Sequence, residues 1–134
     1  MTIVDTSMVV PALATWHVAH DLVRRAAKGA HVAAHARLET YSVLTRMPFP
    51  HRLDGSVVAD LLDRWFPPDR IVVASADLSV SIVDRCNRAG IEGGAVYDAL
   101  VGLTGAEVGA ELLTRDVRAA RTYQLLGIAF RLIR

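Results

Sequence analysis

Two aspartates in this chain each follow a segment that reads as a short buried strand. Asp5 comes directly after Ile3 and Val4. Asp116 comes shortly after residues 111–114. Consecutive aliphatic residues are typical of strands covered on both faces, and in open α/β sheets ligands bind beyond the carboxyl ends of the strands. Carboxylate chemistry is therefore expected at this edge of a sheet, unless each aspartate only caps the helix that follows it.

A third acid, Glu39, lies inside a helix predicted over residues 34–46. At helical spacing its neighbours include small or apolar residues such as Ala36 and Val43. Such a face is an unfavourable place for an unpaired carboxylate. Glu39 is therefore either a functional group or one half of a salt bridge with a nearby arginine such as Arg46.

The fourth acid, Asp98, lies one turn into a helix predicted over residues 95–106. The same helical face carries Gly102 and Gly105. A glycine inside a helix costs about 1 kcal/mol relative to alanine, so these glycines predict the close approach of another backbone or of a substrate. The alternative is structural, with the charge of Asp98 complementing the dipole at the start of the helix.

Strands and helices alternate along the whole sequence. Strands are predicted near residues 3–5, 30–33, 71–73, 111–114 and 129–133, and helices near residues 8–13, 17–28, 34–46, 57–65, 78–88, 95–106 and 116–126. In the helix over 17–28, one apolar stripe is predicted, made of Val18, Leu22, Val23 and Ala26. The alternation is typical of βαβ units, in which helices cover both faces of a parallel sheet.

The bulk composition favours one soluble domain spanning residues 1–134. Hydrophobic residues make up 52% of the 134, enough for a sizeable core, and the net charge of +1 leaves any nucleic-acid contact to a local patch. Cys86 is the only cysteine, which excludes an intrachain disulfide and a cysteine zinc site. We find no signal peptide and no membrane-length apolar run, so a cytoplasmic protein without membrane contact is expected.

Four stretches match one known family in order and spacing. They are residues 3–7 (IVDTS), 38–46 (LETYSVLTR), 97–100 (YDAL) and 113–116 (LTRD). With these motifs the sequence resembles the PIN-domain ribonucleases, and most of all the VapC toxins of bacterial toxin–antitoxin pairs. The resemblance covers nearly the whole chain. It implies a three-layer α/β/α fold with a central parallel sheet of about five strands in the order 3-2-1-4-5.

The resemblance also implies a metal site. The four acids, Asp5, Glu39, Asp98 and Asp116, would be both the catalytic residues and the ligands of Mg²⁺ or Mn²⁺. Oxygen-only ligands suit these ions rather than zinc. Thr114 would support the site through its hydroxyl, and Thr6 is a second candidate for that role. Many relatives carry one more acid after the fourth motif, where this chain has residues 117–120 (VRAA), so the number of metal ions stays open.

In this family the metal activates a water molecule for hydrolysis of an RNA phosphodiester bond. Arg46, Arg52 and Arg115 are candidates for RNA binding, although a role as solvated surface charges is equally open for each. The implied partners are the RNA substrate, a small cognate antitoxin protein and a second copy of the chain. The apolar early helices, including Met8, Val9, Leu13 and Trp16, are predicted surfaces for these protein contacts.

An alternative function is a catalytically inactive PIN-like module that binds RNA or protein. The presence of all four acids argues against it. Other strand-end aspartate enzymes fit less well, because a haloacid-dehalogenase-type site needs a second aspartate at position 7, which is serine. A G-x-G-x-x-G turn, typical of dinucleotide-binding domains, does not follow the first strand.

Overall fold

The computed structural model describes residues 1–134 and contains one sheet of five parallel strands. The strands are β1 (Thr2–Val4), β2 (His31–Ala33), β3 (Ile71–Val72), β4 (Glu111–Thr114) and β5 (Phe130–Leu132). Their order in the sheet is β3-β2-β1-β4-β5. The predicted α/β fold class and strand order are therefore confirmed, with the first strand in the middle of the sheet.

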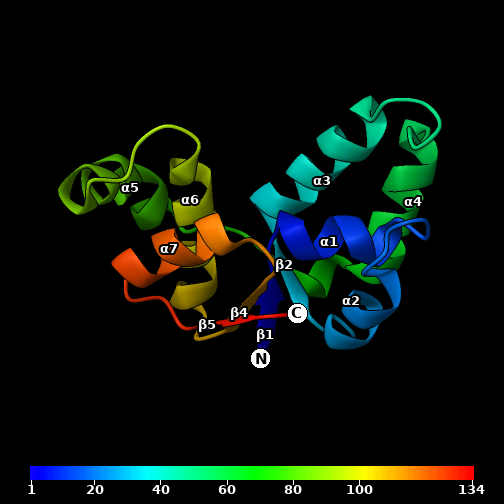
Figure 1. The fold of residues 1–134 in the computed structure, drawn as a ribbon. Helices are drawn as coiled ribbons and strands as arrows, with labels where there is room; N and C mark the ends of the chain where they lie inside the picture. The colour runs from blue at the N-terminus through cyan, green and yellow to red at the C-terminus, as the bar shows by residue number, and fades with distance from the viewer.

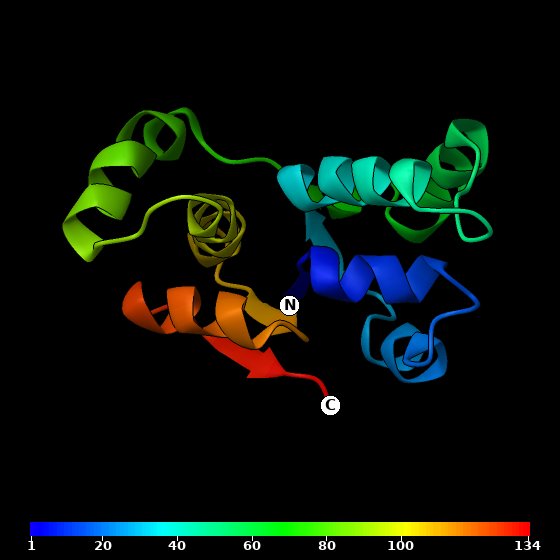
Figure 2. The ribbon, with the colours of Figure 1, turned by 45° about the horizontal axis from the view of Figure 1, so that its top comes forward.

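Seven helices flank the sheet. They are α1 (Thr6–Leu13), α2 (His20–Ala26), α3 (Ala34–Arg46), α4 (Gly55–Trp65), α5 (Ala76–Ala89), α6 (Ala95–Glu107) and α7 (Val117–Leu125), with one 3₁₀ turn, η1 (Pro68–Arg70). In Figures 1 and 2, α1 to α4 gather on one side of the molecule and α5 to α7 on the other. None of the helices has the length and apolar character needed to cross a membrane.

The core is built around β1. Ile3 and Val4 are fully buried, and β1 pairs with β2 on one side and β4 on the other. In the sheet register, Ile3 lies between His31 and Leu112. A central parallel strand is covered by helices on both faces, which is why two consecutive apolar residues are both buried.

The prediction for the second helix was wrong at its N-terminus. Val18 is 98% exposed, because α2 begins only at His20. The preceding residues form turns, one of which is closed when the Ala19 N–H donates to Nδ1 of His17 at 3.0 Å. This local bond competes with helical pairing, as polar side chains near a helix start often do.

The predicted apolar docking surface on the early helices was also wrong. Met8, Val9 and Leu13 are buried in the core, with exposed fractions of 0, 0 and 4%. Only Trp16 of that group is exposed, and its ring packs 4.2 Å from the ring of His51. The apolar stripe of α1 therefore stabilises the fold and offers no free surface to a partner.

The glycines of α6 meet core side chains. A Cβ atom on Gly105 would lie 2.8 Å from Cγ2 of Ile3, and one on Gly102 would lie 2.9 Å from Cδ1 of Tyr123. The prediction of a close approach is confirmed, but neither a substrate nor another backbone makes it. These two glycines let α6 pack tightly against β1 and α7, which fixes the position of Asp98.

Candidate active site

A small pocket of about 50 Å³ opens at the carboxyl end of β1. Its lining residues are Asp5, Thr6, Ser7, His35, Glu39, Tyr97, Asp98, Val101 and Asp116. All four predicted acids therefore face one space, although they come from four different parts of the chain. Thr6 also lines this space, but its hydroxyl makes no hydrogen bond to an acid.

Asp5 is the most buried of the four acids, with 5% of its surface exposed. Its carboxylate accepts hydrogen bonds from the Ser7 hydroxyl at 2.5 Å and from the Tyr123 hydroxyl at 2.8 Å. Although Asp5 stands at the N-cap position of α1, its carboxylate accepts no hydrogen bond from the backbone of that helix, which argues against the alternative that Asp5 is only a helix cap. Burial raises the pKa of Asp5, and hydrogen bonds from Ser7, Thr114 and Tyr123 oppose that rise.

Ser7 connects the ends of the two strands that carry aspartates. Its Oγ donates to Asp5, accepts the Arg115 N–H at 2.8 Å and lies 3.2 Å from Oγ1 of Thr114. This role of Ser7 was not predicted from the sequence. The spacing of two residues from Asp5 was a usable signal, because a short hydroxyl side chain at that distance can turn back to a carboxylate.

Tyr123 was not predicted at all. It is fully buried on α7, and its hydroxyl reaches Asp5 from 118 residues away in sequence. Burial and the negative charge of Asp5 raise the pKa of Tyr123. The phenol therefore stays protonated and acts as a fixed donor. Nothing in the local sequence distinguishes it from an ordinary core tyrosine.

Asp98 is half-buried in the first turn of α6. Burial raises its pKa to about 6, and the charges of Asp116, Asp5 and Glu39 act in the same direction. The four acids are therefore close enough to repel one another. A helix dipole alone does not account for this position, since a dipole at a helix start would lower the pKa of an acid.

Asp116 caps α7, as predicted. Its Oδ1 accepts the N–H groups of Arg118 and Ala119 at 2.8 and 3.3 Å. Thr114, predicted to support the site, accepts the N–H of Asp116 at 3.1 Å through its hydroxyl. These bonds fix the direction of the Asp116 carboxylate and leave its second oxygen for the pocket.

Glu39 does not form the alternative salt bridge to Arg46. The one ionisable side chain within ion-pair distance of Glu39 is His35, with 3.7 Å between Nε2 and Oε2. The guanidinium of Arg46 contacts the Ser42 hydroxyl instead, at 3.4 Å. Glu39 therefore has no arginine partner, although it lies on a face shared with the acid pocket.

The other two predicted arginines lie differently. The Arg115 guanidinium donates to the carbonyl of Ile133 at 3.1 Å, which attaches it to the end of the chain. The Arg52 Nε donates to the carbonyl of Met47 at 3.0 Å, in the loop after α3. None of the three predicted arginines lines the acid pocket, but Arg46 lines an adjoining hollow together with Glu39.

The donor set of the pocket fits a hard divalent cation. Four carboxylates and one imidazole, that of His35, line the pocket, and the mutual repulsion of the carboxylates is the kind that a cation relieves. As the structure stands, no group of three or more His, Cys, Asp or Glu side chains converges closely enough to hold an ion. A cation here would therefore be held partly through water, which Mg²⁺ retains readily, or after small side-chain movements.

The family model described as the PIN domain matches residues 2–125. A Mycobacterium tuberculosis protein named Ribonuclease VapC40 is 43% identical over 130 residues, which is 96% of both chains. The crystal structure of M. tuberculosis VapC20, titled a sarcin–ricin loop cleaving toxin, superposes with a TM-score of 0.69 at 21% identity and covers 90% of this chain and 94% of that one. A VapBC2 structure from Rickettsia felis, bound to a DNA fragment of its promoter, superposes with a TM-score of 0.67 at 12% identity, covering 98% and 97%.

Proposed function

Because the chain belongs to the PIN-domain family, we propose that its four-acid pocket hydrolyses RNA phosphodiester bonds with the help of Mg²⁺ or Mn²⁺. The observation that carries the proposal is the meeting of Asp5, Glu39, Asp98 and Asp116 at one pocket. Similarity to a protein named a ribonuclease, over 96% of both chains, supports RNA as the substrate class.

In this proposal Asp5, Asp98 and Asp116 are the principal metal ligands. Glu39, at the rim, completes the ligand set directly or through water and helps to orient the attacking water. When bound, the divalent cation lowers the pKa of a water molecule and offsets the charge that grows on the phosphate. Ser7 and Tyr123 hold the Asp5 carboxylate in one orientation, and the cap of α7 does the same for Asp116.

We further propose that the chain is the toxin of a toxin–antitoxin pair. Its partner would be a small antitoxin protein that covers the pocket. The chain's similarity to proteins named VapC supports this partner class. A cationic antitoxin side chain would be attracted by the same four carboxylates that repel RNA in the absence of metal.

The test is cleavage of end-labelled total RNA in the presence of Mg²⁺, Mn²⁺ or EDTA. We expect discrete cuts with either cation, no cuts with EDTA, and loss of the cuts in Asp98→Asn. The matched control is Asp69→Asn, which makes the same chemical change at an exposed acid outside the pocket and should cleave normally. Cuts that persist in EDTA or in a folded Asp98→Asn variant would contradict the proposal.

A further inference from the structure

A second hollow adjoins the acid pocket. It measures about 350 Å³ and is lined by His35, Leu38, Glu39, Ser42, Arg46 and Tyr97. Three of these residues, His35, Glu39 and Tyr97, also line the acid pocket. A molecule held in the hollow would therefore lie beside the acid pocket and in contact with residues that line both spaces.

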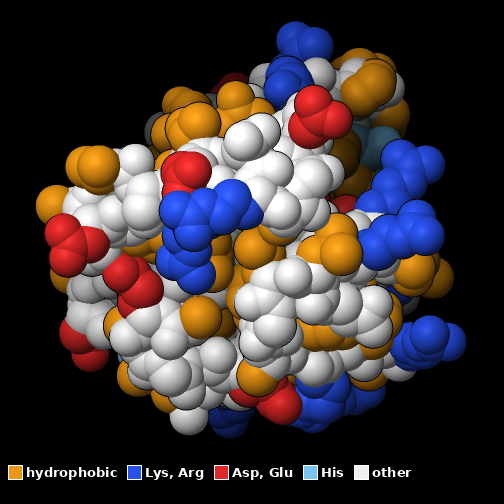
Figure 3. Space-filling model, turned by 90° about the vertical axis from the view of Figure 1, so that its left-hand side faces the viewer, with side chains coloured by type: hydrophobic (Ala, Val, Ile, Leu, Met, Phe, Trp, Pro, Cys, Tyr) orange, Lys and Arg blue, Asp and Glu red, His pale blue; other side chains and the backbone are white.

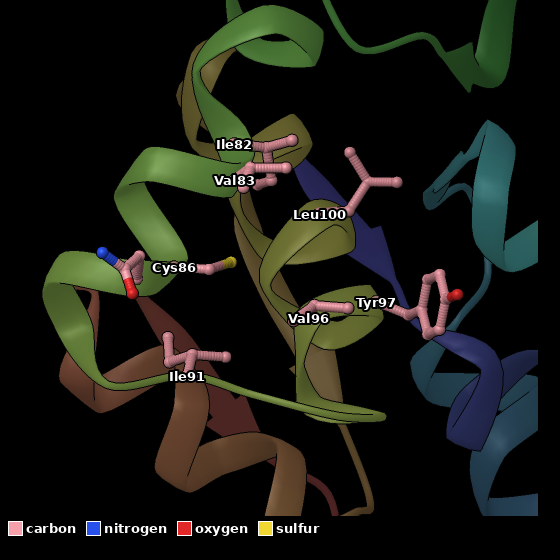
Figure 4. A pocket seen from close by; sticks show the side chains of 8 residues that line it. Ile82, Val83, Cys86, Ile91, Val96, Tyr97 and Leu100 are labelled. Atoms are coloured by element: carbon pink, nitrogen blue, oxygen red, sulfur yellow. The ribbon is translucent and has the colours of Figure 1, made fainter.

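Tyr97 provides a flat aromatic surface at this junction. Its ring stacks on the imidazole of His35, with 5.2 Å between ring centroids and 5° between ring planes. The residue is nevertheless 54% exposed. A separate apolar groove lies between α5 and α6, and Figure 4 shows the Tyr97 ring directed away from the other labelled side chains of that groove and toward α3. The stack holds the ring rigid while part of it stays open to solvent.

Arg46 provides a positive charge that the fold does not use. Other arginines of the chain, such as Arg37 and Arg131, form ion pairs with carboxylates. Arg46 forms none, is exposed, and contacts only the Ser42 hydroxyl. A guanidinium in a hollow that adjoins an acidic pocket is well suited to hold a phosphate group that the four carboxylates would otherwise repel.

We propose that this hollow is a nucleotide subsite beside the scissile phosphate. A base of single-stranded RNA stacks against Tyr97, and Arg46 binds an adjacent phosphate. The inference rests on the proposed ribonuclease function and deepens it, because it assigns a substrate-binding role to residues outside the acid pocket. It also predicts unpaired RNA as the substrate, since a base must leave its duplex stack to reach an aromatic side chain.

The test is binding of fluorescein-labelled RNA of about 12 nucleotides and randomised sequence, measured by fluorescence anisotropy with Mg²⁺. All proteins carry Asp98→Asn, so that no RNA is cut. Tyr97→Leu keeps an apolar side chain but removes the ring, and is expected to weaken binding by roughly 5- to 100-fold. Tyr97→Phe keeps the ring and should bind RNA as tightly as the parent protein, which carries Asp98→Asn alone. Melting curves verify that each variant is folded.

The role of Arg46 is tested by the salt dependence of the same binding. Arg46→Gln should reduce the slope of log Kd against log salt by about 0.7, the value for one phosphate contact on a single strand. The matched control is Arg24→Gln on α2, an exposed arginine that removes the same charge outside both hollows. Its slope should equal that of the parent.

Unchanged RNA affinity in Tyr97→Leu, or a parent that binds no RNA, would overturn the subsite. Equal salt slopes for Arg46→Gln and Arg24→Gln would overturn the phosphate contact. These results are independent of the cleavage assay. If the parent binds RNA through Tyr97 and Arg46 while the wild-type chain cuts none, the subsite stands and the ribonuclease proposal fails.

Discussion

At the residue scale, the pocket depends on side chains that hold its acids in place. Tyr123→Phe removes the buried donor to Asp5 and nothing else. The loss of one partner to a buried carboxylate should cost about 1–3 kcal/mol in the free energy of unfolding. Thermal or urea unfolding measures this loss in the free energy of unfolding. Tyr41→Phe is the control, because that hydroxyl is on a partly exposed ring and makes no hydrogen bond to an acid. Equal stability losses in the two variants would contradict this role for Tyr123.

A second prediction at the residue scale concerns how stability changes with pH, because the pKa of Asp98 is raised. In the folded protein the pKa is about 6, above the ordinary 3.8, so folding favours the protonated acid. The stabilisation is present at low pH and is lost as the pH rises through about 6. In EDTA, the melting temperature of Asp98→Asn minus that of the wild type should therefore increase between about pH 4 and pH 7. A difference in melting temperature that does not change with pH would contradict the raised pKa of Asp98.

The acids were predictable from sequence because each stands in a local pattern. Asp5 and Asp116 follow strands, and Glu39 and Asp98 lie on unusual helix faces. Tyr123 was not predictable, because its function depends on a contact across 118 residues. The roles of all four acids in catalysis remain predictions, although the structure brings them to one pocket.

At the element scale, the position of α6 depends on its glycines. Gly105→Ala would place a Cβ atom 2.8 Å from Ile3 in the central strand. Overpacking of this kind costs about 1–3 kcal/mol, more than alanine regains in helix propensity. We expect a lower melting temperature for this variant. Gly94→Ala is the control, because no atom lies within 4 Å of its added Cβ. Equal or higher stability in Gly105→Ala would show that α6 packs against Ile3 more loosely than the structure indicates.

Most elements could be predicted because their sequence patterns are strong. The helix over 34–46 and the strand over 111–114 agree with the structure to the residue. The predicted start of α2 was wrong because of a local contact, the hydrogen bond from the Ala19 N–H to the His17 ring. The spacing of apolar residues does not reveal such a contact. The sheet order came from the family resemblance, since short strands alone do not specify their neighbours.

At the scale of the whole molecule, the acids of the pocket come from both of the helix groups that Figures 1 and 2 show on opposite sides of the molecule. Asp5 and Glu39 belong to the half that contains α1 to α4, and Asp98 and Asp116 to the half that contains α6 and α7. On the face at the α5 side, Figure 3 shows mostly apolar and uncharged groups, with acidic side chains chiefly toward the left of the view and basic ones chiefly toward the right. That face therefore offers no broad field of one sign, and RNA binding would depend on local contacts near the pocket.

The predicted homodimer is also a property of the whole molecule. The burial of Met8, Val9 and Leu13 removes the surface first assigned to it. Exposed apolar residues elsewhere, including Leu38 on α3 and Val83 on α5, leave other surfaces for a second copy. We expect light scattering to give twice the mass of one chain for the protein alone, and the mass of two chains plus the bound antitoxin for the complex. A monomer under both conditions would contradict the homodimer.

The central claim is that four carboxylates act together, through a divalent cation, to cut RNA. The most direct test measures RNA cleavage against Mg²⁺ concentration for the wild type and for Asp5→Asn, Glu39→Gln, Asp98→Asn and Asp116→Asn. We predict cleavage that requires Mg²⁺ in the wild type, loss of activity in the three aspartate variants, and reduced activity in Glu39→Gln. Wild-type cleavage without metal, or full activity in any folded variant, would contradict the account.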